Sequence, residues 1–176
     1  MSVDDSQRAA WVKEAVDRFS GPLVRYVQVI TGDVEQARDV VQDAFIRLCA
    51  ENPERVNSHL AQWLFTVCRH RAVDLQRKQR KSKTLPQTQM EAVVCSEPSP
   101  AMQAEQREAS DEALRLLALL PKNQQEVVRL KFQNGLSYRE ISEVTHLSVS
   151  NVGFLLHTAL KTLRQQMKSA LTRKMP

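Results

Sequence analysis

The sequence is poor in glycine, in aromatic residues and in long apolar runs. Its 176 residues include four Gly, and aromatic residues make up 5% of the chain. Leu, Ala, Gln, Glu, Lys and Arg, which favour helices, are frequent instead, so the composition predicts an all-helical protein. No stretch approaches the roughly eighteen apolar residues that a membrane-spanning helix needs.

Cysteine is also scarce. Cys49, Cys68 and Cys95 are widely spaced and lack a C-x-x-C pair or a nearby His pair, so the sequence indicates neither a disulfide framework nor a zinc site. Cys49 and Cys68 fall within apolar helical patterns, so we expect both to be small core residues. The N-terminus, MSVDDSQRAA, carries acids where a secretory signal has cations followed by an apolar core, and this favours a cytoplasmic protein.

Charge gathers in two basic blocks that flank an acidic connector. Residues 1–83 carry 14 Lys or Arg against 11 Asp or Glu, residues 84–112 carry 1 against 6, and residues 113–176 carry 10 against 3. Such blocks indicate a polyanionic partner, either nucleic acid or an anionic membrane. No continuous apolar face of lipid-binding size lies opposite the cations, which disfavours membrane contact.

The connector has the composition of a linker, with Pro86, Pro98, Pro100, several Gln and Ser, and one short apolar run. We therefore divide the chain into a first helical domain at 1–83, a flexible acidic linker at 84–112 and a second helical domain at 113–176. No strand and no internal repeat is predicted.

In the first domain, helices are expected at 7–19 and 23–30, separated by a break at Gly21-Pro22. Asp33, with Gln36 three residues later, forms a capping-box pattern that opens a third helix running through Ala50. Asn52-Pro53 closes that helix, and a fourth runs from about 58 to 79. The predicted buried stripe of the fourth helix is Leu60, Trp63, Leu64, Val67, Cys68 and Leu75.

In the second domain, a helix at 113–120 ends at Pro121, and a helix at 124–133 is stopped by Gly135 in the C′ position. Ser137 and Glu140 then form a second capping box. The segment 145–147 interrupts the apolar pattern, and Ser148 caps a last helix. Two short helices joined by a tight turn in a basic chain predict a helix-turn-helix that reads DNA. The alternative is an ordinary pair of packed helices.

The last helix has two distinct faces. Its apolar face consists of Val152, Leu155, Leu156, Ala159, Leu160 and Leu163, and its other face carries Ser150, Asn151, Phe154, His157, Thr158 and Lys161. The second set offers short polar groups, an aromatic ring and a cation to base edges and phosphates. This helix is therefore the candidate recognition helix.

Three segments, in this order, resemble motifs of the extracytoplasmic-function class of bacterial RNA polymerase sigma factors. They are DVVQDAFIRL at 39–48, HLAQWLFTVCRHRAVDLQRKQRK at 59–81, and LPKNQQEVVRLKFQNGLSYREISEVTHLS at 120–148. The resemblance implies an alternative sigma subunit that has no catalytic chemistry and directs polymerase to a subset of promoters. It also implies that the first domain binds core polymerase and melts DNA, while the second reads an element farther upstream.

Carried over residue by residue, the resemblance implies that Asp39, Gln42 and Asp43 face a basic coiled coil of the largest polymerase subunit. Asp39 and Asp43 are four residues apart and so share a helix face. Melting requires a basic track for phosphates and polar or aromatic groups for unstacked bases. The melting candidates are Asn57, Ser58, His59, Arg69, Arg71, Asp74, Arg77 and Lys78. The alternative for these acids and cations is an ordinary solvated face.

The candidates for the upstream element are Ser148, Ser150, Asn151, Phe154, His157, Lys161 and Arg164. Three cations that are usual in relatives are replaced here by Gly153, Leu155 and Thr158. Glycine inside a helix costs about 0.5–1 kcal/mol relative to alanine, so we expect the backbone at Gly153 to lie close to DNA or a partner. The alternative is that Phe154 and Leu155 form an apolar patch for an inhibitory partner or another part of the holoenzyme.

Two other function classes compete with the sigma factor. A free-standing helix-turn-helix regulator that binds palindromic DNA as a dimer would leave the motifs of the first domain without a role. A nucleic-acid enzyme is disfavoured because the sequence shows no P-loop, clustered carboxylates or Ser/His/Asp grouping. We predict no catalytic residue, cofactor, metal or small-molecule substrate. The expected partners are core RNA polymerase, promoter DNA and an anti-sigma factor.

Overall fold

The computed structural model describes residues 3–82 and 113–174, and all regular secondary structure within these ranges is helical. This confirms the predicted all-α fold. The chain divides into two compact units, and we call residues 3–82 the first unit and residues 113–174 the second unit. The predicted linker and Cys95 lie outside the described residues.

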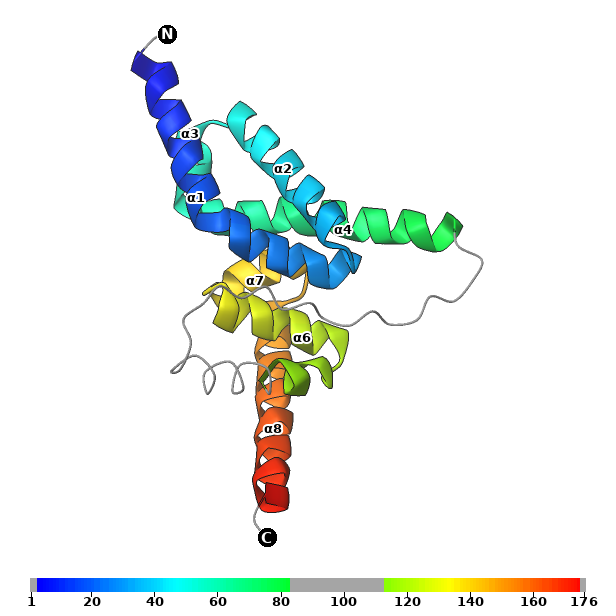
Figure 1. The fold of residues 1–176 in the computed structure, drawn as a ribbon. Coiled ribbons are helices and arrows are strands. Elements are labelled where there is room, and N and C mark those ends of the chain that lie inside the picture. Colours follow the sequence, from blue (N-terminus) through cyan, green and yellow to red (C-terminus); the bar gives the residue numbers. More distant parts are fainter. Residues whose placement is uncertain (1–2, 83–112, 175–176) are drawn as a thin grey trace, which may run out of the picture. The chain divides into compact units, whose positions relative to one another are not determined.

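Three long helices form the first unit, and each packs against the other two. They are α1 (Val3–Thr31), α2 (Val34–Ala50) and α4 (Leu60–Ser82), and Figure 1 shows them side by side. Their shared core contains Leu23, Val27, Val40, Leu48, Leu64 and Phe65. The Tyr26 ring meets Phe65 edge to face with 5.2 Å between ring centroids, an aromatic arrangement that adds to the burial of apolar area.

Helix α1 continues through Gly21 and Pro22, so the predicted break between two helices at 7–19 and 23–30 is wrong. Proline inside a helix costs about 3 kcal/mol because it removes a backbone donor and crowds the preceding turn. Leu23, Tyr26 and Val27 follow it and are at most 4% exposed. Burial of side chains like these contributes about 1.5–3 kcal/mol each, which outweighs the cost. Figure 1 shows α1 changing direction along its length, as expected of a helix that contains proline.

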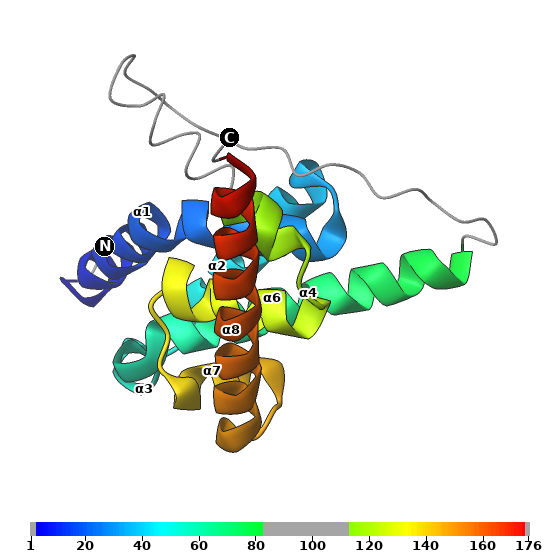
Figure 2. The ribbon, with the colours of Figure 1, turned by 90° about the horizontal axis from the view of Figure 1, so that it is seen from below.

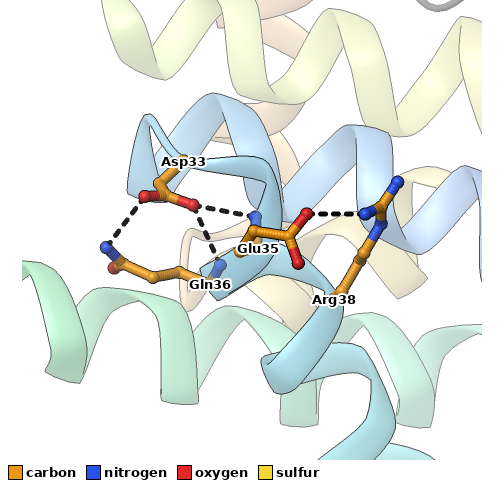
Figure 3. A network of polar contacts seen from close by, with 4 residues as sticks. All are labelled: Asp33, Glu35, Gln36 and Arg38. Atoms are coloured by element: carbon orange, nitrogen blue, oxygen red, sulfur yellow. Dashed lines mark hydrogen bonds and ion pairs between the residues drawn. The ribbon is translucent and has the colours of Figure 1, made fainter.

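Helix α2 ends at Ala50, as predicted, and its N-terminus is capped by Asp33 (Figure 3). The Asp33 carboxylate accepts hydrogen bonds from the backbone N–H groups of Glu35 at 2.8 Å and Gln36 at 3.0 Å. The Gln36 side chain donates to the second Asp33 carboxylate oxygen at 3.4 Å. The predicted capping interaction is therefore present. In a standard capping box the Gln36 side chain would bond the backbone N–H of Asp33, whereas here it bonds the Asp33 carboxylate.

A short connection joins α2 to α4. Asn52 accepts from the backbone N–H of Glu54 at 3.0 Å, and Pro53 opens helix α3 (Pro53–Val56) at a position where no backbone donor is needed. The predicted stop at Asn52-Pro53 is therefore also the start of a new helical turn. A 3₁₀ turn, η1 (Asn57–His59), leads from it into α4.

The buried stripe of α4 differs in part from the prediction. Leu64 and Cys68 are buried as expected, and Phe65 and Ala72 are buried although they were not predicted. The remaining members of the predicted stripe, Leu60, Trp63, Val67 and Leu75, are half-buried. Helix α4 packs against both α1 and α2, so its buried surface is wider than a single stripe.

The second unit begins with helical residues 113–118. Helix α6 (Lys122–Val128) follows and continues into a π-helical turn, η2 (Arg129–Gln133). In this turn the backbone N–H of Asn134 donates to the Arg129 carbonyl at 3.2 Å, five residues back. Gly135 then adopts a φ of 71°, the left-handed conformation expected of a glycine that ends a helix.

Helices α7 (Tyr138–Thr145) and α8 (Val149–Lys174) form the predicted helix-turn-helix. The Ser137 backbone N–H donates to Glu140 at 2.7 Å, and the Glu140 backbone N–H donates to the Ser137 hydroxyl at 3.3 Å, which confirms the capping box. His146 takes a φ of 59° in the turn. The Ser148 hydroxyl accepts from the backbone N–H of Asn151 at 3.2 Å. Helix α8 packs against α6 (Figure 2).

Candidate functional site

The outer face of α2 carries the three residues predicted to bind polymerase. Asp39 and Gln42 are exposed, and Asp43 is half-buried. The opposite side of the helix is buried through Ala37, Val40, Val41, Ala44, Phe45 and Leu48. This burial fixes the orientation of α2, so Asp39 and Asp43 lie one turn apart on its accessible side.

An ion pair joins this acidic face to the basic helix α4. Nε of Arg71 lies 3.5 Å from Oδ2 of Asp43, and the two side chains are 41% and 49% exposed. Pairs with this exposure contribute about 0–1 kcal/mol, so either residue can exchange its partner at low cost. Sequence reasoning placed Asp43 and Arg71 in separate sites and missed this contact, because the residues are far apart in the chain.

The melting candidates on α4 occupy more than one side of the helix. Arg71, Asp74 and Lys78 follow one another at spacings of three and four and therefore share a face. Arg77 donates to the Asp74 carboxylate at 3.0 Å. Arg69 lies two residues before Arg71 and so projects from a different side. Four of the five candidates thus form one surface along the second half of α4.

The loop candidates lie together in η1. Asn57 and Ser58 are exposed and His59 is half-buried, and the Ser58 hydroxyl lies 3.1 Å from Nδ1 of His59. The indole Nε1 of Trp11, from α1, donates to Oδ1 of Asn57 at 3.4 Å. Sequence reasoning missed Trp11, because no local pattern links it to a loop 46 residues away.

All seven upstream-element candidates on α8 and its cap are exposed. Ser150, Phe154, His157, Lys161 and Arg164 recur at alternating spacings of four and three, so they form one stripe along the helix. Ser148 and Asn151 lie beside the start of this stripe. The opposite side is held in the core by Val152, Leu155, Leu156 and Ala159. The structure thus brings the predicted set onto one accessible surface.

The alternative of an apolar patch formed by Phe154 and Leu155 is contradicted at Leu155, whose predicted place on the apolar face of the last helix is confirmed. Phe154 is 66% exposed, whereas Leu155 is 7% exposed and belongs to the core. Gly153, beside them, faces the ring of Tyr138. A Cβ atom at Gly153 would lie 3.7 Å from Cε2 of that ring, an ordinary van der Waals distance. In the described residues the close neighbour of Gly153 is therefore a side chain of α7.

Two pKa shifts mark buried groups away from these surfaces. Burial raises the pKa of the Cys68 thiol to about 12, so this cysteine is neutral at physiological pH. Burial lowers the pKa of Arg129, whose guanidinium donates to Gln133 at 3.5 Å, although arginine stays charged in proteins. Cys49 is exposed, so its predicted core position is wrong: it follows the buried Leu48 on the outer side of the last turn of α2.

Among residues 3–82 and 113–174, no group of three or more His, Cys, Asp or Glu is placed to hold a metal ion. No helix in these ranges is both long enough and apolar enough to cross a membrane. The candidate surfaces consist of exposed acids, exposed cations and short polar side chains. This arrangement suits binding of charged macromolecules.

Comparison with known proteins assigns both units to one family. The model of Sigma-70 region 2 matches residues 15–82, and the model of Sigma-70, region 4, matches residues 110–163. The solved structure of CnrH in complex with the cytosolic domain of CnrY has a TM-score of 0.57 and 23% identity, covering 93% of this chain and 94% of that chain. This likeness supports the fold.

Relatives with curated names span nearly the whole chain. The ECF RNA polymerase sigma factor SigM of Bacillus subtilis is 26% identical over 163 residues, which cover 92% of this chain and 96% of SigM. SigL of Mycobacterium tuberculosis is 29% identical over 161 residues, covering 89% of this chain and 88% of SigL. RpoE of Cereibacter sphaeroides is 28% identical over 167 residues, covering 93% of this chain and 88% of RpoE. The chain belongs to the extracytoplasmic-function group of the sigma-70 family of RNA polymerase sigma factors.

Proposed function

We propose that this chain is an alternative sigma factor that binds core RNA polymerase and directs transcription initiation at a specific subset of promoters. One observation carries the proposal. The match to Sigma-70 region 2 falls on the unit that contains α2 and α4, and the match to Sigma-70, region 4, falls on the unit that contains the helix-turn-helix.

In this proposal, residues 1–83 bind polymerase and melt the promoter, residues 84–112 link the domains, and residues 113–176 read the upstream element. The exposed carboxylates of Asp39 and Asp43, with Gln42, attract a basic surface of polymerase. The loop 57–59 and the basic side of α4 receive single-stranded DNA. The stripe on α8 enters the major groove, where side chains distinguish base pairs by their donors and acceptors.

The proposal assigns the chain a binding role, with no covalent step of its own. Melting is favoured when unstacked bases and phosphates find partners on the protein that compensate for the stacking they lose. We place the protein in the cytoplasm, where promoter DNA and polymerase meet. An anti-sigma factor is the third partner in the proposal, and it follows from the family resemblance.

A free-standing dimeric helix-turn-helix regulator is the competing function. It accounts for α7 and α8 but gives no role to the region 2 match at residues 15–82, nor to an acidic face on α2. A nucleic-acid enzyme would require several reactive groups close together. On the described surfaces, the acids Asp43 and Asp74 are instead each paired with an exposed arginine. The sigma factor is the function that uses both units.

The test combines purified protein with core polymerase and genomic DNA, followed by sequencing of the 5′ ends of the transcripts. We expect a limited set of specific start sites that core polymerase alone does not produce. The start sites should share a sequence element upstream. If the same transcripts appear with and without the protein, the proposed function is wrong, and binding of a palindromic duplex by the protein alone would favour the dimeric regulator.

A further inference from the structure

The last turns of α4 leave the apolar core of the first unit. Ala72 is fully buried, whereas no residue between 73 and 80 is buried. Figure 1 shows this end of α4 extending past the turn that joins α1 to α2. The same segment carries the exposed cations Arg77, Lys78 and Arg80. Apolar packing therefore contributes little to holding the part of α4 that is proposed to receive single-stranded DNA.

Without further contacts this end of α4 would be expected to fray. The ends of helices open most readily, and Arg77 and Arg80 are three residues apart, where like charges are neighbours and repel each other. Arg77 is paired with Asp74 at 3.0 Å, but both side chains are exposed, so this ion pair adds little. Contacts other than charge and apolar burial are therefore needed to keep these turns in order.

Two glutamine side chains fasten this end of α4 to the turn between α1 and α2. Nε2 of Gln76 donates to the backbone carbonyl oxygen of Ile30 at 2.9 Å, and Nε2 of Gln79 donates to Oε1 of Gln36 at 2.6 Å. Both glutamines of α4 are half-buried, and each bond joins residues more than 40 positions apart in the chain. Gln76 and Gln79 are three residues apart, so they continue the face of α4 on which Ala72 is buried.

The groups that accept these two bonds are themselves held in place. Ile30 lies in the last turn of α1, where backbone carbonyls lack a partner within the helix, so Gln76 satisfies one of them. Gln36 lies in the first turn of α2, and its Nε2 contacts the Asp33 carboxylate that caps this helix (Figure 3). The end of α4 is therefore fastened to the ends of two packed helices.

We propose that Gln76 and Gln79 are positioning residues that keep the last turns of α4 helical. Arg77, Lys78 and Arg80 then form a preordered track for the phosphates of single-stranded DNA. Binding to a preordered track avoids the conformational entropy that would be lost if backbone and side chains became ordered only on binding. The inference rests on the proposed function, in which the basic side of α4 receives the melted strand.

The test removes the bond between α2 and α4 without changing any charge. Gln79→Met keeps the length of the side chain but removes its donor, and Gln36→Ala removes the acceptor while leaving α4 unaltered. Binding of labelled oligo(dT) to the full chain is titrated at several salt concentrations. We expect each variant to bind about 2- to 10-fold more weakly, the range that corresponds to one hydrogen bond. The slope of log affinity against log salt should stay unchanged, because no cation is lost.

Hydrogen exchange of backbone amides shows whether the loss of order is local. The amides of residues 77–82 should exchange faster in both variants, while those of residues 60–68 should exchange as in the wild type. Alanine and methionine favour helices at least as well as glutamine, so helix propensity predicts no such change. The combined variant should bind no more weakly than Gln79→Met alone, because both substitutions remove the same bond.

Three results would overturn the proposal. The first is wild-type exchange at residues 77–82, and the second is faster exchange there with unchanged oligo(dT) affinity. The third is equally faster exchange at residues 60–68, which would assign the glutamines to the general stability of the unit. Gln165→Ala, at an exposed glutamine of α8, is the matched control and should change neither affinity nor exchange in α4.

The transcription assay separates this inference from the proposed function. Specific start sites, together with wild-type oligo(dT) affinity in the Gln36 and Gln79 variants, would overturn the positioning role and leave the sigma function standing. Absence of specific start sites would overturn the sigma function, while affinity and exchange would still decide whether the glutamines order the track. Absence of oligo(dT) binding by the wild-type chain would overturn the track on α4, and the positioning role with it.

Discussion

The two surfaces proposed to contact DNA differ in how their charges are held. On α4, the cations Arg71 and Arg77 are already engaged, one with Asp43 at 3.5 Å and the other with Asp74 at 3.0 Å. On α8, the start of the stripe is uncharged, and the cations Lys161 and Arg164 follow only after two further turns. The α4 surface therefore consists mainly of charged side chains, whereas the α8 surface begins with uncharged polar and aromatic side chains.

This difference separates affinity from specificity. Phosphate contacts by Lys and Arg supply salt-dependent affinity with little sequence information, whereas contacts with base edges supply discrimination. The α8 stripe has few cations, so we expect weak binding of the isolated second unit to duplex DNA. In the proposed function, docking of α2 on polymerase makes the two units linked modules, so the effective concentration of DNA near α8 would rise without any new contact.

Charge reversal on α2 should have the largest effect, because in the proposed function both DNA surfaces reach the promoter only after α2 has docked on polymerase. Asp39→Arg combined with Asp43→Arg places cations against a basic partner, and such like-charge contacts cost several kcal/mol. We expect holoenzyme assembly to be abolished on a native gel, with an unchanged helical circular dichroism spectrum.

The matched control is Glu14→Arg with Asp17→Arg, two exposed acids on α1, which should leave assembly intact. Arg71→Gln removes the ion pair with Asp43 while leaving the acids of α2 in place, so it separates the effect of that pair from the effect of the polymerase interface. Assembly of the charge-reversed double variant at wild-type levels would remove the acidic face of α2 from the proposed interface.

On α8, base reading and phosphate anchoring can be separated by two single substitutions. Asn151→Ala should relax discrimination at one or two adjacent base pairs, because a good hydrogen-bonding pair between a side chain and a base contributes about 1–3 kcal/mol of discrimination. Lys161→Ala should weaken all sequences about equally. The measurement is selection of promoter sites by holoenzyme from a randomised upstream element. Identical selected motifs for wild type and Asn151→Ala would show that the helix does not read DNA through this residue.

Much of the fold could be predicted because its signals are local. The caps at Asp33, Ser137 and Ser148, the left-handed Gly135 and the apolar spacing of α8 each lie within a few residues of the boundary they set. The predicted helix break at Gly21-Pro22 was wrong because the outcome there is not decided by local sequence. Its outcome depends on how much area Leu23, Tyr26 and Val27 bury against other helices, which a local signal does not contain.

The candidate surfaces show the same limit. The residues of the α8 stripe could be chosen from one helix, and all are exposed. The contacts of Asp43 with Arg71 and of Trp11 with Asn57 could not be predicted, because each joins two elements that only tertiary packing brings together. Cys49 was misjudged because it lies at the edge of an apolar face, where spacing alone does not decide between core and surface.

The α4 surface should show its dependence on charge through salt. Arg77→Ala combined with Lys78→Ala removes two cations, so the slope of log affinity against log salt for single-stranded DNA should flatten by about 1.4. The assay titrates the isolated chain with a labelled oligonucleotide at several salt concentrations. Lys122→Ala with Lys168→Ala, exposed cations of the second unit, is the control. An unaltered slope for the α4 variant would mean that these two cations stay in solvent.

The smallest effect is expected at Gly153, in the proposed DNA-reading helix α8. Alanine is favoured over glycine inside a helix by about 0.5–1 kcal/mol, and its Cβ would make an ordinary contact with Tyr138 at 3.7 Å. We expect Gly153→Ala to stabilise the second unit by this amount in urea unfolding and to leave selection of promoter sites unchanged. Gly135→Ala is the contrasting control, since a φ of 71° strains an alanine and should lower stability. A Gly153→Ala variant that gains stability but no longer binds its selected promoters would show that DNA approaches the backbone there, and glycine would then belong to the reading surface of α8.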